Sequence, residues 1–136
     1  MGSTDMTMTR RSFCAGLSAI PLTRPAFAQD LPLLTAQKAM VQLAPDNYPA
    51  TPVWSYDGTV PGPAIRLAQG SRFERRLVNA LEVPTSIHWH GIRIDNAMDG
   101  VAGLTQEPVR PEQGFNYAFD LPDAGTYWYH AHSNSM

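Results

Sequence analysis

Apolar and polar residues alternate over short stretches along most of the chain, and turn-forming residues separate these stretches. Alternation with a period of two is typical of β-strands that bury one face. The pattern predicts strands over residues 38–43, 53–56, 64–67, 71–79, 86–94, 115–119 and 126–132. Turns spaced about ten residues apart favour an all-β sandwich or barrel.

Glycine and proline mark the connections between these predicted strands. Asp57-Gly58 and Pro61-Gly62-Pro63 follow the strand at 53–56, and two prolines fall within residues 108–113. Helices do not tolerate such residues in their interior, so we expect loops there. Residues 29–37 form a mixed lead-in, residues 48–52 a further loop, and no amphipathic helix is predicted.

The composition fits one small domain. The chain has 136 residues, of which 43% are hydrophobic, and its ten basic and twelve acidic residues give a net charge of −2. Nucleic-acid binding is therefore not expected, because it normally requires a basic excess. Ten glycines and twelve prolines also favour strands and turns over a helical bundle.

Residues 1–28 have the pattern of a cleaved export signal. Arg10 and Arg11 precede a small apolar stretch at 12–22, and Ala26-Phe27-Ala28 offers a signal peptidase site. The paired arginines resemble a twin-arginine signal, and a general secretory signal is the alternative. The apolar stretch is shorter than the ~20 residues of a membrane-spanning helix. We expect a periplasmic or secreted protein without a permanent membrane anchor.

Removal of this segment changes the chemistry that the chain offers. Cys14, the single cysteine, leaves with residues 1–28, so the remaining 108 residues contain no thiol. They carry seven basic and eleven acidic residues, a net charge of −4. Residues 29–136 therefore offer neither a disulfide nor a thiolate ligand.

The four histidines occur in two His-x-His pairs, His88 with His90 and His130 with His132. In a strand, residues i and i+2 project from the same face, so each pair presents both imidazoles on one side. If the two strands are neighbours, four imidazoles converge on a patch that metal ions can bridge. Imidazole without thiolate suits copper or zinc, and the spacing does not separate these metals. The alternative is that each histidine merely fills a half-buried strand position.

The segments around these pairs resemble the copper-binding motifs of the multicopper oxidases, the family that includes laccases and cuprous oxidases. Residues 86–92, Ser-Ile-His-Trp-His-Gly-Ile, are similar to the first motif, and residues 126–133 are similar to the second. Residues 56–66 and 96–106 are similar to an early hairpin and to the loop after the first motif. The resemblance covers residues 53–133, and two histidine motifs at this spacing are a specific signal.

The resemblance implies a cupredoxin, or plastocyanin-like, Greek-key sandwich over residues 29–136, as the N-terminal domain of such an oxidase. It implies that the four histidines are half of the ligands of a trinuclear copper cluster. His88 would bind the type 2 copper, and His90, His130 and His132 would bind the type 3 pair. Further cupredoxin domains of the same parent chain or of another subunit would supply the other half.

Two more residue roles concern the surroundings of the histidines. Asp99 falls where the family places an acidic residue that assists proton delivery to dioxygen, and the alternative is an aspartate that caps the Asp99-Gly100 turn. Trp89 and Trp128 are expected to pack beside the ligands.

The implied activity is the one-electron oxidation of a reductant coupled to the reduction of dioxygen to water. The type 1 copper of the family needs a His-Cys-His segment, and the 136 residues contain none. They also end before the closing strand of the family's first domain. We therefore expect an incomplete domain without turnover on its own. The alternatives are a stand-alone copper-binding or carrier module, an inactive fragment, or a structural protein of this fold that has lost copper. Retention of all four histidines argues against the last.

Overall fold

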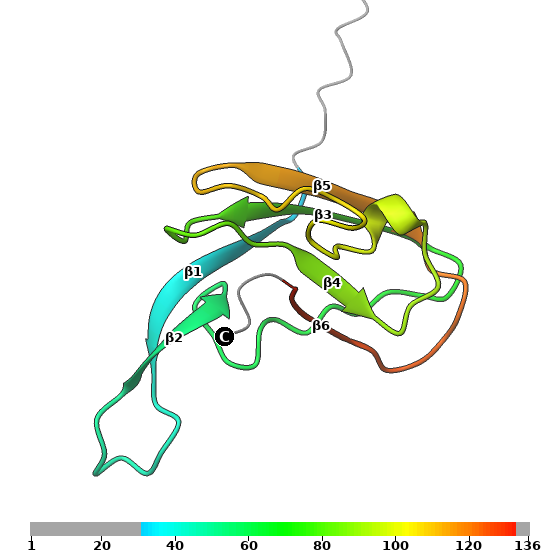
Figure 1. The fold of residues 1–136 in the computed structure, drawn as a ribbon. Coiled ribbons are helices and arrows are strands. Elements are labelled where there is room, and N and C mark those ends of the chain that lie inside the picture. The colour runs from blue at the N-terminus through cyan, green and yellow to red at the C-terminus, as the bar shows by residue number, and fades with distance from the viewer. Residues whose placement is uncertain (1–30, 133–136) are drawn as a thin grey trace, which may run out of the picture. The chain divides into compact units, whose positions relative to one another are not determined.

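The computed structural model describes residues 31–132, which contain six strands and one short 3₁₀ helix joined by loops (Figure 1). The strands form one sheet in the order β2-β1-β3-β5 and a second sheet in which β4 pairs with β6. The all-β prediction is confirmed. The elements are β1 (Leu33–Val41), β2 (Thr51–Tyr56), β3 (Arg72–Asn79), β4 (Ile87–His90), η1 (Asn96–Met98), β5 (Gly114–Asp120) and β6 (Trp128–Ala131).

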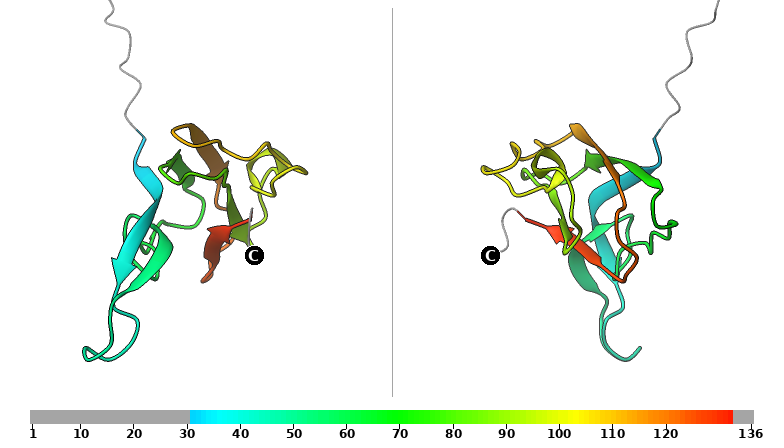
Figure 2. Two further views of the ribbon diagram at one scale, coloured as in Figure 1. Left: turned by 60° about the vertical axis from the view of Figure 1, so that its left-hand side comes forward. Right: turned by 90° about the vertical axis from the view of Figure 1, so that its right-hand side faces the viewer.

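The pairing within the larger sheet is mixed. β1 runs antiparallel to β2 and parallel to β3, and β3 runs antiparallel to β5. β4 lies between β3 and β5 in sequence but belongs to the other sheet, as the ribbon views show (Figure 2). From β3 to β6, consecutive strands alternate between the two sheets, and two such layers enclose a core between them.

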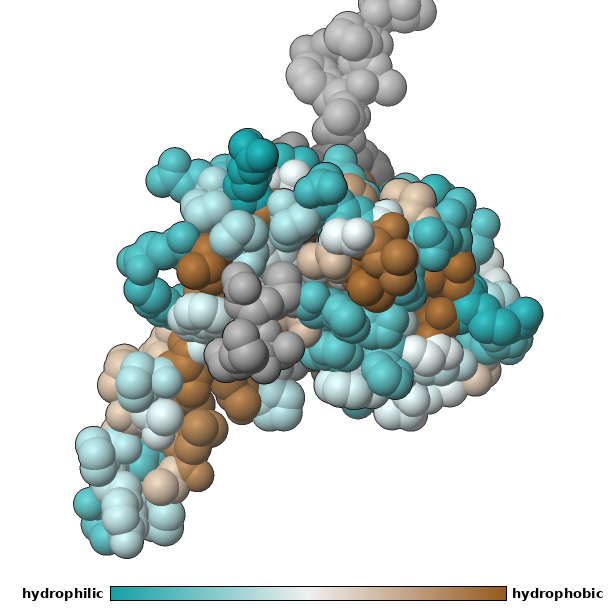
Figure 3. Space-filling view, viewed as in Figure 1, coloured by the Kyte–Doolittle hydropathy of each residue, from teal (hydrophilic) through white to brown (hydrophobic). Residues whose placement is uncertain are grey.

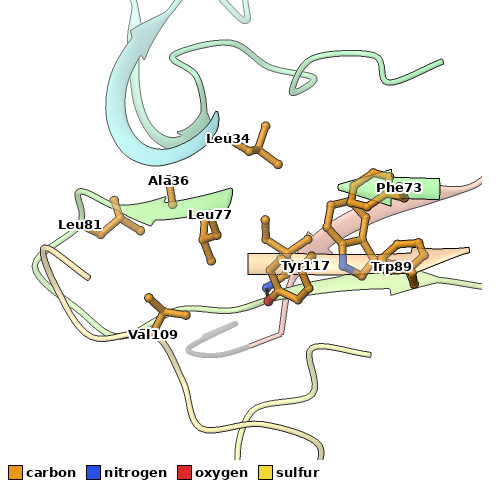
Figure 4. Packing of buried hydrophobic residues seen from close by; sticks show 10 residues of the cluster. Leu34, Ala36, Phe73, Leu77, Leu81, Trp89, Val109 and Tyr117 are labelled. Atoms are coloured by element: carbon orange, nitrogen blue, oxygen red, sulfur yellow. Dashed lines mark hydrogen bonds between the residues drawn. The ribbon is translucent and has the colours of Figure 1, made fainter. Parts of the chain in front are cut away.

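The core lies where the inner face of the larger sheet meets β4. Phe73 stacks on Phe119 with ring centroids 4.5 Å apart, and Trp89 meets the edge of Phe73 at 4.5 Å (Figure 4). Trp89 is 2% exposed, and Leu77 is fully buried. Burial of each such side chain contributes about 1.5–3 kcal/mol. Because Trp89 anchors one face of β4 in the core, the residues on either side of it point to the opposite face.

The first strand begins earlier than predicted. The sequence predicts a strand at 38–43 after a mixed lead-in, whereas β1 covers Leu33–Val41. Leu34 and Ala36 are 2% and 3% exposed and lie in the part of β1 that pairs with β3. This pairing joins segments some forty residues apart, so the local pattern of polar and apolar residues cannot predict the early start of the strand.

The predicted strand at 64–67 is not formed. No hydrogen bond involves the backbone of these four residues within the described part of the chain, and a strand requires a partner ladder. The segment instead lines one side of a groove of about 740 Å³, and residues 123–129 line the other side. The predicted strand is wrong because the tertiary structure supplies no neighbouring strand here.

The β1–β2 ribbon extends away from the remaining strands (Figure 2). Several large apolar side chains are exposed on it, and Figure 3 shows them as a hydrophobic strip along this arm. Met40, Leu43 and Trp54 are 65%, 55% and 53% exposed. Within residues 31–132, no helix is long and apolar enough to cross a membrane. The predicted export signal, residues 1–28, lies outside the described residues.

Candidate metal centre

The two histidine strands are neighbours. β4 and β6 pair antiparallel with His88 opposite His130 and His90 opposite Trp128. Trp89 pairs with Tyr129, and their rings pack 5.5 Å apart on the core side. The i, i+2 rule therefore directs the imidazoles to the other face. The condition under which the four imidazoles converge, that the two His-x-His strands are neighbours, is therefore met.

Three of the four imidazoles are close enough to share metal ions. His88, His90 and His130 each offer a ring nitrogen, and these nitrogens lie within 4.8 Å of one another. The His132 ring, just after the end of β6, is centred 5.3 Å from His88 and 5.9 Å from His130. The structure thus brings all four predicted ligands together, with His132 outside the tightest group.

His88 is the most restrained of the four. Its Nδ1 lies 2.7 Å from the backbone oxygen of Asp99, and its side chain is only 17% exposed. A carbonyl oxygen only accepts hydrogen bonds, so the Nδ1–H of His88 donates to it. Nε2 then has a free lone pair, which is the state that a metal ligand requires.

One ring nitrogen of His130 faces one ring nitrogen of His90. The Nδ1–H of His130 donates to the backbone oxygen of Ala131 at 2.9 Å, which leaves Nε2 as an acceptor. This Nε2 lies 3.4 Å from Nδ1 of His90. Two nitrogen ligands of one tetrahedral ion, each about 2.0–2.1 Å from it, are about 3.3 Å apart. The spacing of this pair therefore matches joint coordination of a single ion.

Trp128 covers part of this patch. Its ring stacks on those of His90 and His130, with centroids 4.8 Å and 4.2 Å apart and interplanar angles of 28° and 24°. The side chain is nevertheless 57% exposed, whereas Trp89 is buried. The prediction that both tryptophans pack beside ligands is correct, but only Trp89 does so in the core. Trp128 limits the orientations of two imidazoles from the solvent side.

Asp99 lies beside His88. Its Oδ1 is 3.4 Å from Nδ1 of His88, and its side chain is 29% exposed. The amide of Val101 donates to Oγ1 of Thr105 at 2.8 Å, so this amide is not capped by the Asp99 carboxylate. The carboxylate therefore faces the histidine patch more closely than the turn that follows it.

A hydrogen bond that joins β4 to the larger sheet was not predicted from the sequence. The backbone amide of Ile87, next to His88, donates to the hydroxyl of Tyr117 on β5 at 2.9 Å. Both residues are fully buried, and burial raises the pKa of the Tyr117 hydroxyl to about 12. The inward position of Tyr117 follows from alternation within β5, but its partner lies in the other sheet, and no sequence pattern identifies it.

The donor set of this patch consists of imidazole nitrogens with one carboxylate nearby. Neutral imidazole is a good ligand for copper and zinc, and copper(II) has the higher affinity for nitrogen sites. Second contacts that fix the orientation of a ligand, such as that of His88, are typical of metal sites. The residues present therefore fit a copper centre.

Comparison with known proteins gives the family of the chain. The family model described as multicopper oxidase matches residues 37–136. Multicopper oxidase MmcO of Mycobacterium tuberculosis is 38% identical over 119 residues, which are 87% of this chain and 23% of that protein. Copper resistance protein A of Escherichia coli is 43% identical over 77 residues, which are 57% of this chain and 13% of that protein. The chain thus spans less than a quarter of the length of these relatives.

Solved structures agree with this result. The structure of Lac15 from a marine microbial metagenome superposes with a TM-score of 0.73 at 47% identity, covering 76% of this chain and 28% of that one. A multi-copper oxidase from Pseudomonas thermotolerans gives a TM-score of 0.72 at 44% identity, covering 76% and 25%. The fold is therefore cupredoxin-like, as the resemblance implied. Since the family model matches most of the sequence, the chain belongs to the multicopper oxidase family.

Proposed function

We propose that this chain supplies one half of a copper cluster at which a multicopper oxidase reduces dioxygen to water. The observation that carries the proposal is the convergence of ring nitrogens of three histidines within 4.8 Å, with the fourth imidazole adjoining. Membership of the family favours copper over zinc as the resident metal. When bound, copper supplies the one-electron steps that couple oxidation of a reductant to the reduction of dioxygen.

The ligand assignment is the one that the resemblance to multicopper oxidases implies. We propose that His88 holds the type 2 copper, and that it does so through Nε2, because its Nδ1–H is bonded to the Asp99 carbonyl. His90, His130 and His132 hold the type 3 pair. The 3.4 Å spacing of His90 Nδ1 and His130 Nε2 supports joint binding of one ion by these two side chains.

Asp99 has a separate role in the proposal. Its carboxylate holds a proton or orients a water beside His88, at Oδ1, without being a metal ligand. The position of Oδ1, 3.4 Å from Nδ1 of His88, supports this role.

Four imidazoles are too few for three copper ions, so other residues must complete the cluster. We propose that further cupredoxin domains, of the same parent chain or of another subunit, supply them. The exposure of His90, His132 and Trp128 supports an interface at this face. The coverage of the relatives supports it too, because they are more than four times as long as the matched part.

Export is also part of the proposal. Residues 1–28 direct the protein out of the cytoplasm through the twin-arginine route, by the pattern around Arg10 and Arg11. Fusion of residues 1–28 to a reporter should give export that the double change Arg10→Lys and Arg11→Lys abolishes. Unchanged export of the double variant would favour the general secretory route.

Copper titration of the metal-free chain tests the metal site. We expect calorimetry to show saturable uptake of copper by the folded protein, and the single changes His88→Gln and His130→Gln to weaken it. Glu82→Gln is the matched control, because it neutralises an exposed carboxylate that pairs with Lys38 and is not among the proposed ligands. Absence of uptake by chain that circular dichroism shows to be folded, or equal uptake by the histidine variants, would refute the proposal.

A further inference from the structure

The loop after β4 approaches this strand so closely that one position admits only glycine. Gly100 is buried and has a φ of +80°, a region that L-amino acids with side chains rarely adopt. A Cβ atom built there would overlap the carbonyl oxygen of Ile87 and lie 3.0 Å from the amide nitrogen of His88. The atoms in the way belong to the backbone of β4, so they cannot move aside as a flexible side chain would.

Gly103, three residues later, provides an internal comparison. Its φ is +76°, close to that of Gly100, but no atom lies within 4 Å of a Cβ built at this position. The two glycines thus share the same backbone requirement and differ in packing. Only Gly100 serves the contact between the loop and β4.

Other contacts hold the loop on each side of Gly100. Asp95 accepts a hydrogen bond from the amide of Ala97 at the start of η1, and the sulfur of Met98 lies 3.5 Å from the amide of Ala118 on β5. On the other side, Oγ1 of Thr105 accepts from the amide of Val101. The loop is therefore a fixed structure that presses the Asp99–Gly100 peptide against β4.

This contact places the acceptor of His88. The Asp99 carbonyl belongs to the same peptide unit as the Gly100 nitrogen, and peptide units are planar and rigid. The Gly100 approach to Ile87 therefore determines where the carbonyl oxygen of Asp99 lies, which is 2.7 Å from Nδ1 of His88. A displacement of about 1 Å would bring this distance beyond hydrogen-bonding range.

We propose that Gly100 is a positioning residue that fixes the tautomer of His88. The loop holds the hydrogen of the neutral imidazole on Nδ1 and leaves Nε2 free for coordination. The backbone of Asp99 does this, while the carboxylate of the same residue has the proton-holding role proposed above. The use of Nε2 by copper rests on the proposed function, whereas the tautomer is a property of the metal-free chain.

Long-range ¹H–¹⁵N NMR of the metal-free chain with ¹⁵N-labelled histidine tests the proposal, since it distinguishes Nδ1–H from Nε2–H. The His88 signals are assigned by their loss in His88→Gln. We expect Nδ1–H at His88 in the wild type and in Gly103→Ala, and a mixture of tautomers in Gly100→Ala. An Nε2–H tautomer in the wild type, or an unchanged His88 in folded Gly100→Ala, would overturn the proposal.

A second variant decides the question if Gly100→Ala does not fold. Asp99→Ala keeps the backbone carbonyl and removes the carboxylate, so His88 should keep Nδ1–H. A change of tautomer in this variant would show that the side chain sets it, and the proposal would be wrong. In a copper titration we expect a ~10- to 100-fold lower affinity for folded Gly100→Ala than for Gly103→Ala. Failure of the wild type to bind copper would refute the proposed function and leave the tautomer result standing.

Discussion

Removal of the Tyr117 hydroxyl group, which binds the backbone of β4, should destabilise the fold. Tyr117→Phe keeps the ring that packs against Trp89, at 5.3 Å between centroids, and deletes only the acceptor of the Ile87 amide. Both Ile87 and Tyr117 are fully buried, so water cannot replace the lost partner. A buried donor left without a partner costs about 1–3 kcal/mol, and we expect the free energy of unfolding to fall by this amount.

Urea denaturation followed by tryptophan fluorescence is the suitable assay, because Trp89 reports on this part of the core. The matched control is Tyr48→Phe, which removes the same atom from a side chain that is 57% exposed. The control should change the free energy of unfolding by less than ~0.5 kcal/mol. If Tyr117→Phe has an equally small effect, the hydrogen bond between the two sheets does not support β4, and the reasoning is wrong.

Three further predictions concern pH and packing. Burial raises the pKa of Tyr117 to about 12, above its ordinary 10.0, so the stability that the neutral hydroxyl contributes is present below pH 10 and lost between pH 10 and 12. The melting temperature of Tyr117→Phe should therefore fall less than that of the wild type between pH 10 and 12. A hydrogen bond from Arg93 lowers the pKa of Asp123 below its ordinary 3.8, so this exposed ion pair stabilises the fold above pH 3.8 and loses its effect as the pH falls further. Asp123→Asn should therefore slightly reduce the acid dependence of the melting temperature, and an unchanged dependence would contradict a stabilising ion pair. Leu77→Ala should lower the free energy of unfolding by about 2–5 kcal/mol in urea titration, and a loss below 1 kcal/mol would place Leu77 outside the packed core.

The sequence predicted the arrangement of the histidines more completely than it predicted the strands around them. The period of two within each strand places both histidines of a pair on one face, and this rule needs no knowledge of the rest of the chain. That the two strands are neighbours was a condition of the prediction, and the pairing of His88 with His130 fulfils it. The resemblance to multicopper oxidases gave the metal, which spacing alone did not.

Contacts between segments distant in the sequence account for what was missed. The start of β1 at Leu33 depends on parallel pairing with β3, and the segment 64–67 lacks a neighbouring strand within the described residues. The hydrogen bond from His88 to the Asp99 carbonyl and the contact of Gly100 with Ile87 are backbone features. No side-chain pattern encodes such contacts, although an Asp-Gly pair does indicate a turn.

Electron paramagnetic resonance of the chain with one equivalent of copper(II) shows whether β4 and β6 bind the metal together, because nitrogen hyperfine couplings count the imidazoles bound to it. We expect couplings from at least two imidazoles in the wild type. The double change His88→Gln and His130→Gln should reduce their number, while Glu82→Gln leaves the spectrum unchanged. A spectrum without imidazole couplings, or one that the double histidine variant reproduces, would contradict the claim that β4 and β6 together form a copper site.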